Sequence, residues 1–154
     1  MEAAIAPDGT TVACCAGGGE IILIDVAGGH TRATLRGDFA MITKLEFSAD
    51  GTHLLGQEQY GHGRLLCFDL DSLALRADWP TLAEMTWSDF ALSPDNSRLA
   101  VTHRAGVEIF DWASMTSRLR FRLDHVVKRC KIAWVGGRLG VQTDYGCAGL
   151  YVVT

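Results

Sequence analysis

Reactive side chains occur along this chain, but none has the spacing of a known catalytic or metal-binding motif. The histidines and cysteines include no C-x₂-C and no H-x₃-H pair. The adjacent Cys14 and Cys15 are expected on opposite faces of one strand, which disfavours joint metal binding. No serine lies in a G-x-S-x-G context, and Ser48 and Ser93 are expected to bond their own backbone in turns. The sequence predicts no catalytic residue, no metal and no cofactor.

Three consecutive glycines, Gly17–Gly19, are a second feature with potential chemistry, because glycine-rich loops can hold phosphates. Such a loop needs a helix directly after the glycines, whose N-terminal N–H groups bind the phosphate. Here the next residues are EIILIDV, in which β-branched residues predict a strand. We therefore interpret Gly17–Gly19 as a hairpin loop.

The overall composition is that of a globular protein. Hydrophobic residues make up 48% of the 154 residues and charged residues 21%. The net charge of −4 argues against a chain that coats nucleic acid or anionic membranes. The five cysteines, odd in number and irregularly spaced, suit a reducing compartment. With no signal peptide or membrane span evident, we expect a cytoplasmic protein that binds neither membranes nor nucleic acid.

An internal repeat organises the chain. The segment Ile5–Val26 recurs as Phe47–Leu70, as Leu92–Trp112 and, in a more divergent form, as Trp134–Val153. In each copy an apolar strand is followed by a turn, a second strand, a glycine-containing turn and a third strand. Repetition at a fixed period of this length is typical of repeat architectures.

Two sets of equivalent positions recur every 40–45 residues. The first apolar residue of the second strand is Val12, Leu54, Leu99 or Leu139, and the third strand ends at Asp25, Asp69, Asp111 or Val152. More polar, alternating segments predict an outer strand in three copies, at His30–Gly37, Leu73–Trp79 and Arg118–Leu123. Four antiparallel strands at this period predict blades of a β-propeller.

We therefore expect an all-β fold of about fifteen strands in a single domain. Its four units span approximately residues 1–37, 38–85, 86–124 and 125–154, and the last unit lacks its outer strand. Equivalent alternating positions predict the inter-blade core, at Val12, Leu23, Leu45, Phe47, Leu54, Leu66, Leu92, Leu99, Ile109 and Trp134.

The turns and strand endings resemble those of the WD40 family. An SPDG-like turn occurs at Ala6–Gly9, Ser48–Gly51 and Ser93–Asn96, and the third strand ends in Ile-Asp or Phe-Asp. The resemblance covers nearly the whole chain and implies a scaffold for protein interactions. No copy has Trp before this Asp and none has the family's Gly-His pair, so the family's His–Ser/Thr–Asp–Trp network is not carried over.

Binding residues are expected on one rim of the blades, because loops vary without disturbing the packed strands. Side chains of the kinds that dominate interfaces lie in the loops between second and third strands and in the links between blades. The candidates are Phe39, Tyr60, His62, Trp87, Arg104, His125, Arg129 and Tyr145. We expect a non-catalytic protein–protein interaction scaffold.

Two other classes of function stay open. A ligand-binding or sensor propeller requires inward polar groups near the first strands, such as Lys44, Glu46 or Asp89. A propeller enzyme requires a tight cluster of histidines and carboxylates, which no spacing indicates. The basic run Arg118–Lys131 is interpreted as a solvated outer strand, with a binding patch for an acidic partner or for nucleic acid as the alternative.

The number of repeats also leads us to expect that other blades pack against this chain. A blade buries both faces against neighbours, so an open row of four leaves two apolar faces exposed. We expect a second copy of the chain to close an eight-bladed homodimeric ring, or further blades of a longer natural chain to complete it. Closure of four blades within one chain is the alternative.

Overall fold

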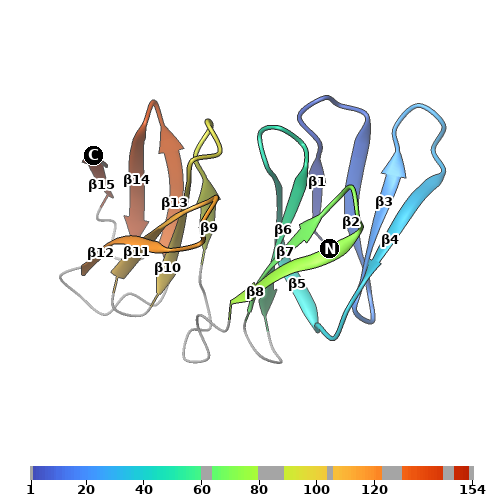
Figure 1. Ribbon diagram of the computed structural model, residues 1–154, viewed down its shortest axis with the longest axis horizontal. Helices are drawn as coiled ribbons and strands as arrows, with labels where there is room; N and C mark the ends of the chain where they lie inside the picture. The colour runs from blue at the N-terminus through green and yellow to red at the C-terminus, as the bar shows by residue number, and fades with distance from the viewer. Residues whose placement is uncertain are drawn as a thin grey trace. The chain divides into compact units, whose positions relative to one another are not determined.

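The structure, a computed structural model, describes residues 2–59, 64–79, 89–103, 106–122, 130–143 and 148–152. Within these ranges every regular element is a β-strand, and the strands form four antiparallel sheets (Figure 1). The fold class predicted from the sequence is confirmed: the protein is all-β and built from propeller blades. The described residues include no helix long and apolar enough to cross a membrane.

The first two sheets have four strands each, in chain order. The first contains β1 (Ala3–Ile5), β2 (Thr11–Gly17), β3 (Glu20–Asp25) and β4 (Thr31–Arg36). The second contains β5 (Met41–Phe47), β6 (His53–Gln59), β7 (Leu65–Asp69) and β8 (Ala74–Trp79). We refer to these sheets as blades 1 and 2.

The remaining sheets are blades 3 and 4. Blade 3 contains β9 (Phe90–Leu92), β10 (Arg98–His103), β11 (Gly106–Asp111) and β12 (Ser117–Arg122). Blade 4 has three described strands, β13 (Cys130–Val135), β14 (Arg138–Thr143) and β15 (Ala148–Val152). As expected from the repeat, this last sheet has no counterpart of β4, β8 and β12 among the described residues.

The turn between first and second strands has the same chemistry in blades 2 and 3. The Ser48 hydroxyl donates to Asp50 at 2.6 Å and accepts the N–H of His53 at 2.9 Å. Ser93 makes the equivalent bonds to Asp95 and Arg98. These are the backbone-directed turn serines that the sequence predicts, so neither is placed as a nucleophile.

The turn after the third strand depends on the aspartate that ends that strand. The Asp69 Oδ1 atom accepts the N–H of Ser72 at 2.8 Å, and Asp111 accepts that of Ser114 at 3.0 Å. The residue that follows is left-handed in each blade, with φ of 57° at Leu73 and 56° at Met115. Blade 1 has Gly29 at this position, the residue type that adopts such a conformation without steric cost.

Each four-stranded blade has a β-bulge at the same point of its outer strand. Leu23 and Ile24 of β3 pair with Ala33 and Thr31, so the residue between them is extra. The same shift occurs between β7 and β8 and between β11 and β12. The extra residue is an arginine each time: Arg32, Arg76 and Arg118.

The chain divides into two compact units, one of residues Met1–Ala83 and one of residues Glu84–Thr154. In the first unit, the core includes Ala13, Ile21 and Leu35 of blade 1 with residues such as Leu45 and Leu54 of blade 2. In the second, a core cluster joins Ala100, Val107 and Ile109 of blade 3 to residues of blade 4, including Leu139 and Val141.

Eight of the ten predicted core residues are buried. The exceptions are Val12 and Trp134, which are half-buried. Trp134 packs against the core of the second unit, while its Nε1–H donates to the carbonyl oxygen of Ala91 at 3.0 Å. An indole N–H needs such an acceptor when it leaves water, and this explains why Trp134 sits at the boundary of the core.

Candidate functional site

Of the eight predicted rim residues, the structure describes only Phe39. The other seven lie outside the described residues: Tyr60, His62, Trp87, Arg104, His125, Arg129 and Tyr145. Phe39 is 8% exposed, and its ring meets that of Phe68 edge to face with the centroids 5.9 Å apart. The Phe39 side chain is therefore mostly buried in the core, because the link between blades 1 and 2 folds its ring inward.

The link that contains Phe39 is held closely against the loop between β2 and β3. The Gly37 N–H donates to the carbonyl oxygen of Gly19 at 3.2 Å. A Cβ atom on Gly19 would lie 2.6 Å from the Gly37 oxygen and 3.2 Å from the Phe39 oxygen. Only glycine permits this approach, so the third glycine of the Gly17–Gly19 loop has a packing role.

An ion pair fixes the same link from the side of blade 2. The Glu58 side chain is 1% exposed and accepts the N–H of Ala40 at 2.7 Å. The Arg64 Nε atom donates to Glu58 at 3.1 Å, and the Arg64 Nη2 atom donates to the carbonyl oxygen of Asp38. Burial alone would raise the pKa of Glu58, but the bonds from Ala40 and Arg64 outweigh it and lower the pKa. The link is thus held on both sides.

Beside this link lies an apolar groove of about 380 Å³, which we call the rim groove. It runs between blades 1 and 2 at the end where β2 meets β3. Its lining residues are Glu2, Cys15, Ala16, Gly17, Glu20, Phe39, Ala40, Met41, Ile42 and Thr43. Met41 is 50% exposed although it begins a strand whose neighbouring residue Ile42 is only 5% exposed. The groove therefore offers an adaptable apolar side chain to solvent.

The polar groups around the rim groove are mostly occupied. Glu20 forms an ion pair with Arg36 at 2.7 Å. Burial raises the pKa of the Cys15 thiol, and the neighbouring Cys14 raises it further, so this thiol stays neutral. The groove thus has the chemistry of an apolar binding surface and lacks an activated nucleophile among its lining residues.

The residues that a central ligand site would use are engaged in local interactions. Lys44 pairs with Glu46 of the same strand at 3.4 Å. Asp89 is 3% exposed and accepts the N–H of Ile132 at 3.0 Å, which ties β13 to the start of blade 3. Lys131 lies 3.8 Å from the same carboxylate. Asp89 therefore has a structural role that the sequence did not indicate, since its partner is 43 residues away.

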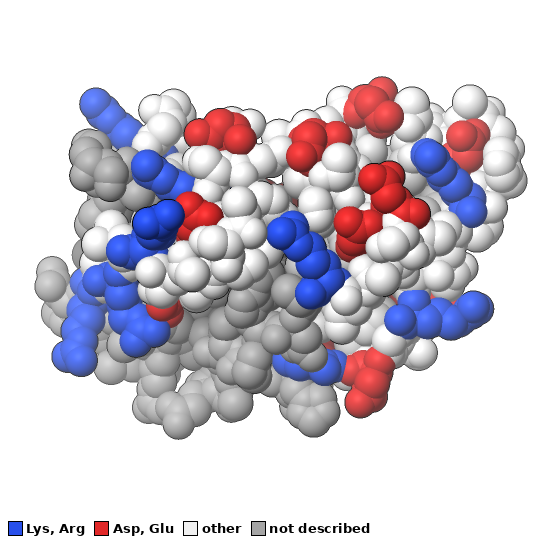
Figure 2. Space-filling view, in the orientation of Figure 1, with Lys and Arg blue, Asp and Glu red and all other residues white. Residues whose placement is uncertain are grey.

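The part of the basic run that lies in β12, Arg118–Arg122, is an outer strand with exposed arginines, as the sequence predicts. Arg118 and Arg120 are 65% and 63% exposed, and they pair with Asp111 and Glu108 of the neighbouring strand β11. Lys and Arg side chains gather over β12 on the face drawn in Figure 2, with acidic side chains among them. Arg118 is the extra residue of the bulge in β12, so it lies outside the regular alternation of side chains along that strand. The charges of Arg118 and Arg120 are thus neutralised by carboxylates of the neighbouring strand.

The arrangement of the potential metal ligands and the state of the cysteines can be described for the part of the chain that the structure covers. No group of three or more His, Cys, Asp or Glu side chains there is arranged to hold a metal ion. Cys14, Cys15, Cys67 and Cys130 are free thiols. Burial raises the pKa of Cys67 to about 12, which keeps it protonated and unreactive.

Comparison with known proteins identifies neither a family nor a curated relative. No model of a known family matches the chain, and no curated protein matches it. A chain of hydrazine synthase from Kuenenia stuttgartiensis is structurally similar, with a TM-score of 0.71 and 14% sequence identity over 93% of this chain. At this sequence identity, the similarity shows only that the two chains share a fold. This chain spans 41% of that neighbour, and 1037 solved chains match in all, so the fold is too widespread to specify an activity.

Proposed function

We propose that this protein is a non-catalytic scaffold that binds other proteins, and that the rim groove receives an apolar side chain of a partner segment. The observation that supports this most directly is the exposed Met41 beside a backbone held on both sides, by Gly19 and by the Glu58–Arg64 pair. A surface that is already ordered loses little conformational entropy when it binds.

The size and chemistry of the rim groove suit such a contact. Its volume of about 380 Å³ lies within the range of ligand pockets and accommodates a side chain such as Leu, Met or Phe. Interface energy is concentrated in a few buried apolar or aromatic anchors, surrounded by a polar rim. Glu20 and Arg36 provide polar groups beside the groove.

The resemblance of the turns to WD40 repeats supports the same proposal. The structural neighbour is named as an enzyme, but at 14% identity the likeness does not extend to activity. We place the protein in the cytoplasm and include a second copy of the chain among its partners. The mass in solution tests the second copy, since a homodimer has twice the 16.7 kDa of the chain.

A random peptide library displayed on phage tests the rim groove, with binding of selected peptides measured by fluorescence polarisation. We expect enrichment of peptides with a bulky apolar residue and at least a tenfold loss of affinity in Met41→Glu, because the charge cannot be buried in the groove. The matched control is Val26→Glu. Val26 is 51% exposed, follows β3 at the opposite end of the blade and does not line the groove.

Two outcomes would contradict the proposal. One is that selected peptides bind Met41→Glu as tightly as the parent. The other is that Val26→Glu reduces binding as strongly as Met41→Glu, which would place the contact elsewhere. Far-UV circular dichroism of both variants controls for loss of the fold.

A further inference from the structure

A second cavity, of about 550 Å³, opens at the other end of blades 1 and 2. We call it the turn pocket because the turns of both blades form much of its wall. Its lining residues are Ala6, Pro7, Asp8, Thr11, Leu23, Arg32, Ala33, Phe47, Ala49, Asp50, Gly51, Leu70, Asp71 and Leu73. The rim groove and the turn pocket share no lining residue.

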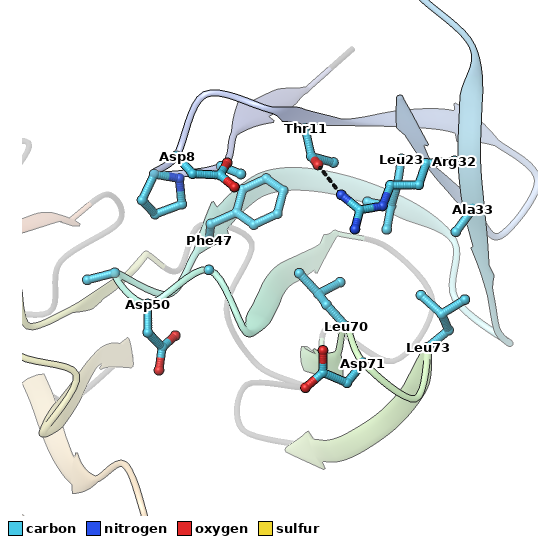
Figure 3. Close-up of a pocket in the computed structure, with 14 residues that line it drawn as sticks. Asp8, Thr11, Leu23, Arg32, Ala33, Phe47, Asp50, Leu70, Asp71 and Leu73 are labelled. Carbon is cyan, nitrogen blue, oxygen red and sulfur yellow. Dashed lines mark hydrogen bonds between the residues drawn. The ribbon is translucent and has the colours of Figure 1, made fainter. Parts of the chain in front are cut away.

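Arg32 places a positive charge in the turn pocket. It is the extra residue of the β4 bulge, and its guanidinium reaches into the space between Thr11 and Leu70 (Figure 3). Its Nη1 atom donates to the Thr11 hydroxyl at 3.0 Å. Within the described ranges this is the only hydrogen bond of its side chain, and it forms no ion pair there. Most of its five N–H donors therefore face the pocket or solvent.

The equivalent arginine of blade 3 has a different partner. Arg118 donates to the Asp111 carboxylate at 3.0 Å, so its charge is neutralised by its own blade. The corresponding aspartate of blade 1, Asp25, accepts the N–H of Gly28 just as Asp111 accepts that of Ser114, but the hydrogen bond of Arg32 goes to Thr11 and not to Asp25. The guanidinium of Arg32 interacts electrostatically with Asp8, but no carboxylate of the described residues forms an ion pair with it, so it can pair with a carboxylate from outside the protein.

Three carboxylates surround the pocket, and two of them are occupied. Asp8 accepts the N–H and the hydroxyl of Thr10, each at 2.9 Å. Asp50 accepts the Ser48 hydroxyl at 2.6 Å and the N–H of Thr52 at 3.1 Å. The exposed Asp71 side chain accepts no hydrogen bond from any residue that the structure describes. Asp71 lies on the side of the pocket opposite Thr11 in Figure 3.

These charges limit the kinds of ligand that fit. A purely anionic ligand such as phosphate would meet Arg32 but also three carboxylates. A purely cationic ligand would face the guanidinium. A ligand with one charge of each sign satisfies both, and an apolar body suits the wall formed by Leu23, Phe47 and Leu70.

We propose that the turn pocket binds a small zwitterionic ligand with an apolar body, an apolar amino acid or a short peptide. Its carboxylate pairs with Arg32, whose planar fork matches a carboxylate in a bidentate manner. Its ammonium group lies near Asp71, and its side chains pack against the apolar wall. This site is independent of the rim groove.

Isothermal titration calorimetry with leucine and leucyl-leucine tests the proposal and distinguishes the two sources of this chemistry. N-acetyl-leucyl-leucine lacks the ammonium group, and leucyl-leucinamide lacks the carboxylate. We expect saturable binding of leucine or of leucyl-leucine. For the dipeptide series, each blocked analogue should bind at least tenfold more weakly.

Variants locate the site. Arg32→Gln should weaken binding at least tenfold, and Arg32→Lys should be intermediate because it keeps the charge but loses the fork. The matched control Arg118→Gln removes the equivalent bulge arginine of blade 3 and should leave binding unchanged. Met41→Glu should also leave binding unchanged, which separates this proposal from that of the rim groove.

Several results would overturn the inference: no saturable binding of leucine or the dipeptide, blocked analogues that bind as tightly as the parent ligand, or undiminished binding by Arg32→Gln. Circular dichroism and urea denaturation establish that each variant is folded. If Arg32→Gln does not fold, the affinities of Arg32→Lys and Arg118→Gln are compared. The inference then requires that Arg32→Lys binds the ligand more weakly than Arg118→Gln does.

Discussion

Leu54 of β6 lies directly opposite Phe68 of β7, and both side chains are essentially buried, at 0% and 1% exposed. Leu99 and Phe110 occupy the same register in blade 3, where Leu99 also pairs with Leu92 of the inner strand. The second-strand leucine is therefore the central member of a row of apolar side chains that crosses the blade.

Truncating this leucine should destabilise the protein strongly. We expect Leu54→Ala and Leu99→Ala each to lower the free energy of unfolding by about 2–5 kcal/mol, because each leaves a cavity in a packed core. Urea denaturation measures the change. The control Leu75→Ala alters a side chain that is 46% exposed and should cost much less. Equal stability of Leu54→Ala and the parent would refute the equivalence of these positions.

Replacing Leu73 by glycine should stabilise the protein. Leu73 has φ of 57° and is 45% exposed, so its conformation is costly for a residue with a Cβ atom while its side chain is only partly packed. We expect Leu73→Gly to raise the free energy of unfolding by about 0.5–1 kcal/mol. The reverse change, Gly29→Leu in blade 1, should lower it by about 1–2 kcal/mol. Thermal denaturation with matched urea titrations measures both.

Acid should weaken the turns of blades 2 and 3. Burial alone would raise the pKa of Asp50, but hydrogen bonds from Ser48 and Thr52 outweigh it and lower the pKa to about 2. The hydroxyl of Ser93, followed by the amide of Ser97, lowers the pKa of Asp95 to about 2. Both carboxyls thus bind protons more weakly when folded than when unfolded, where aspartate has a pKa of about 4.

Their contribution to stability is therefore present above about pH 4 and is lost as the pH falls towards about 2. We expect the double variant Asp50→Asn, Asp95→Asn to show a flatter dependence of the free energy of unfolding on pH in this window. The asparagine oxygens still accept the turn hydrogen bonds, so the variant should remain folded at pH 7. An unchanged slope between pH 4 and pH 2 would show that these carboxyls do not govern it.

Breaking the Glu58–Arg64 pair should be costly, because the Glu58 side chain is 1% exposed and that of Arg64 is 14% exposed. We expect Glu58→Ala to lower the free energy of unfolding by about 3–5 kcal/mol, since it removes the carboxylate that balances the charge of Arg64 and accepts the Ala40 N–H. Replacing both residues by leucine should cost less than Glu58→Ala, because no charge then remains buried. A double variant less stable than Glu58→Ala would contradict this account.

Local sequence patterns are sufficient to predict the strands, their grouping into blades and most of the core. Strand formation follows from local alternation, which recurs in every copy, and from turn chemistry, which recurs in three of the four. The positions Leu54, Leu99 and Leu139 are therefore equivalent in the pairing registers as well as in the repeat. Eight predicted core residues are buried because alternate residues of a strand share a face.

The candidate sites, in contrast, depend on contacts between segments that are distant in the sequence. Phe39 faces inward because Phe68, 29 residues later, provides its packing partner, and no local pattern specifies that contact. Arg32 enters the turn pocket because a bulge shifts the register of β4, and a bulge is a property of the strand pair. Asp89 and Glu58 also owe their structural roles to distant segments. Their carboxylates accept hydrogen bonds from the backbone amides of Ile132 and Ala40, respectively. Periodicity reports which face a side chain occupies, but a cavity or a buried ion pair depends on which segments meet.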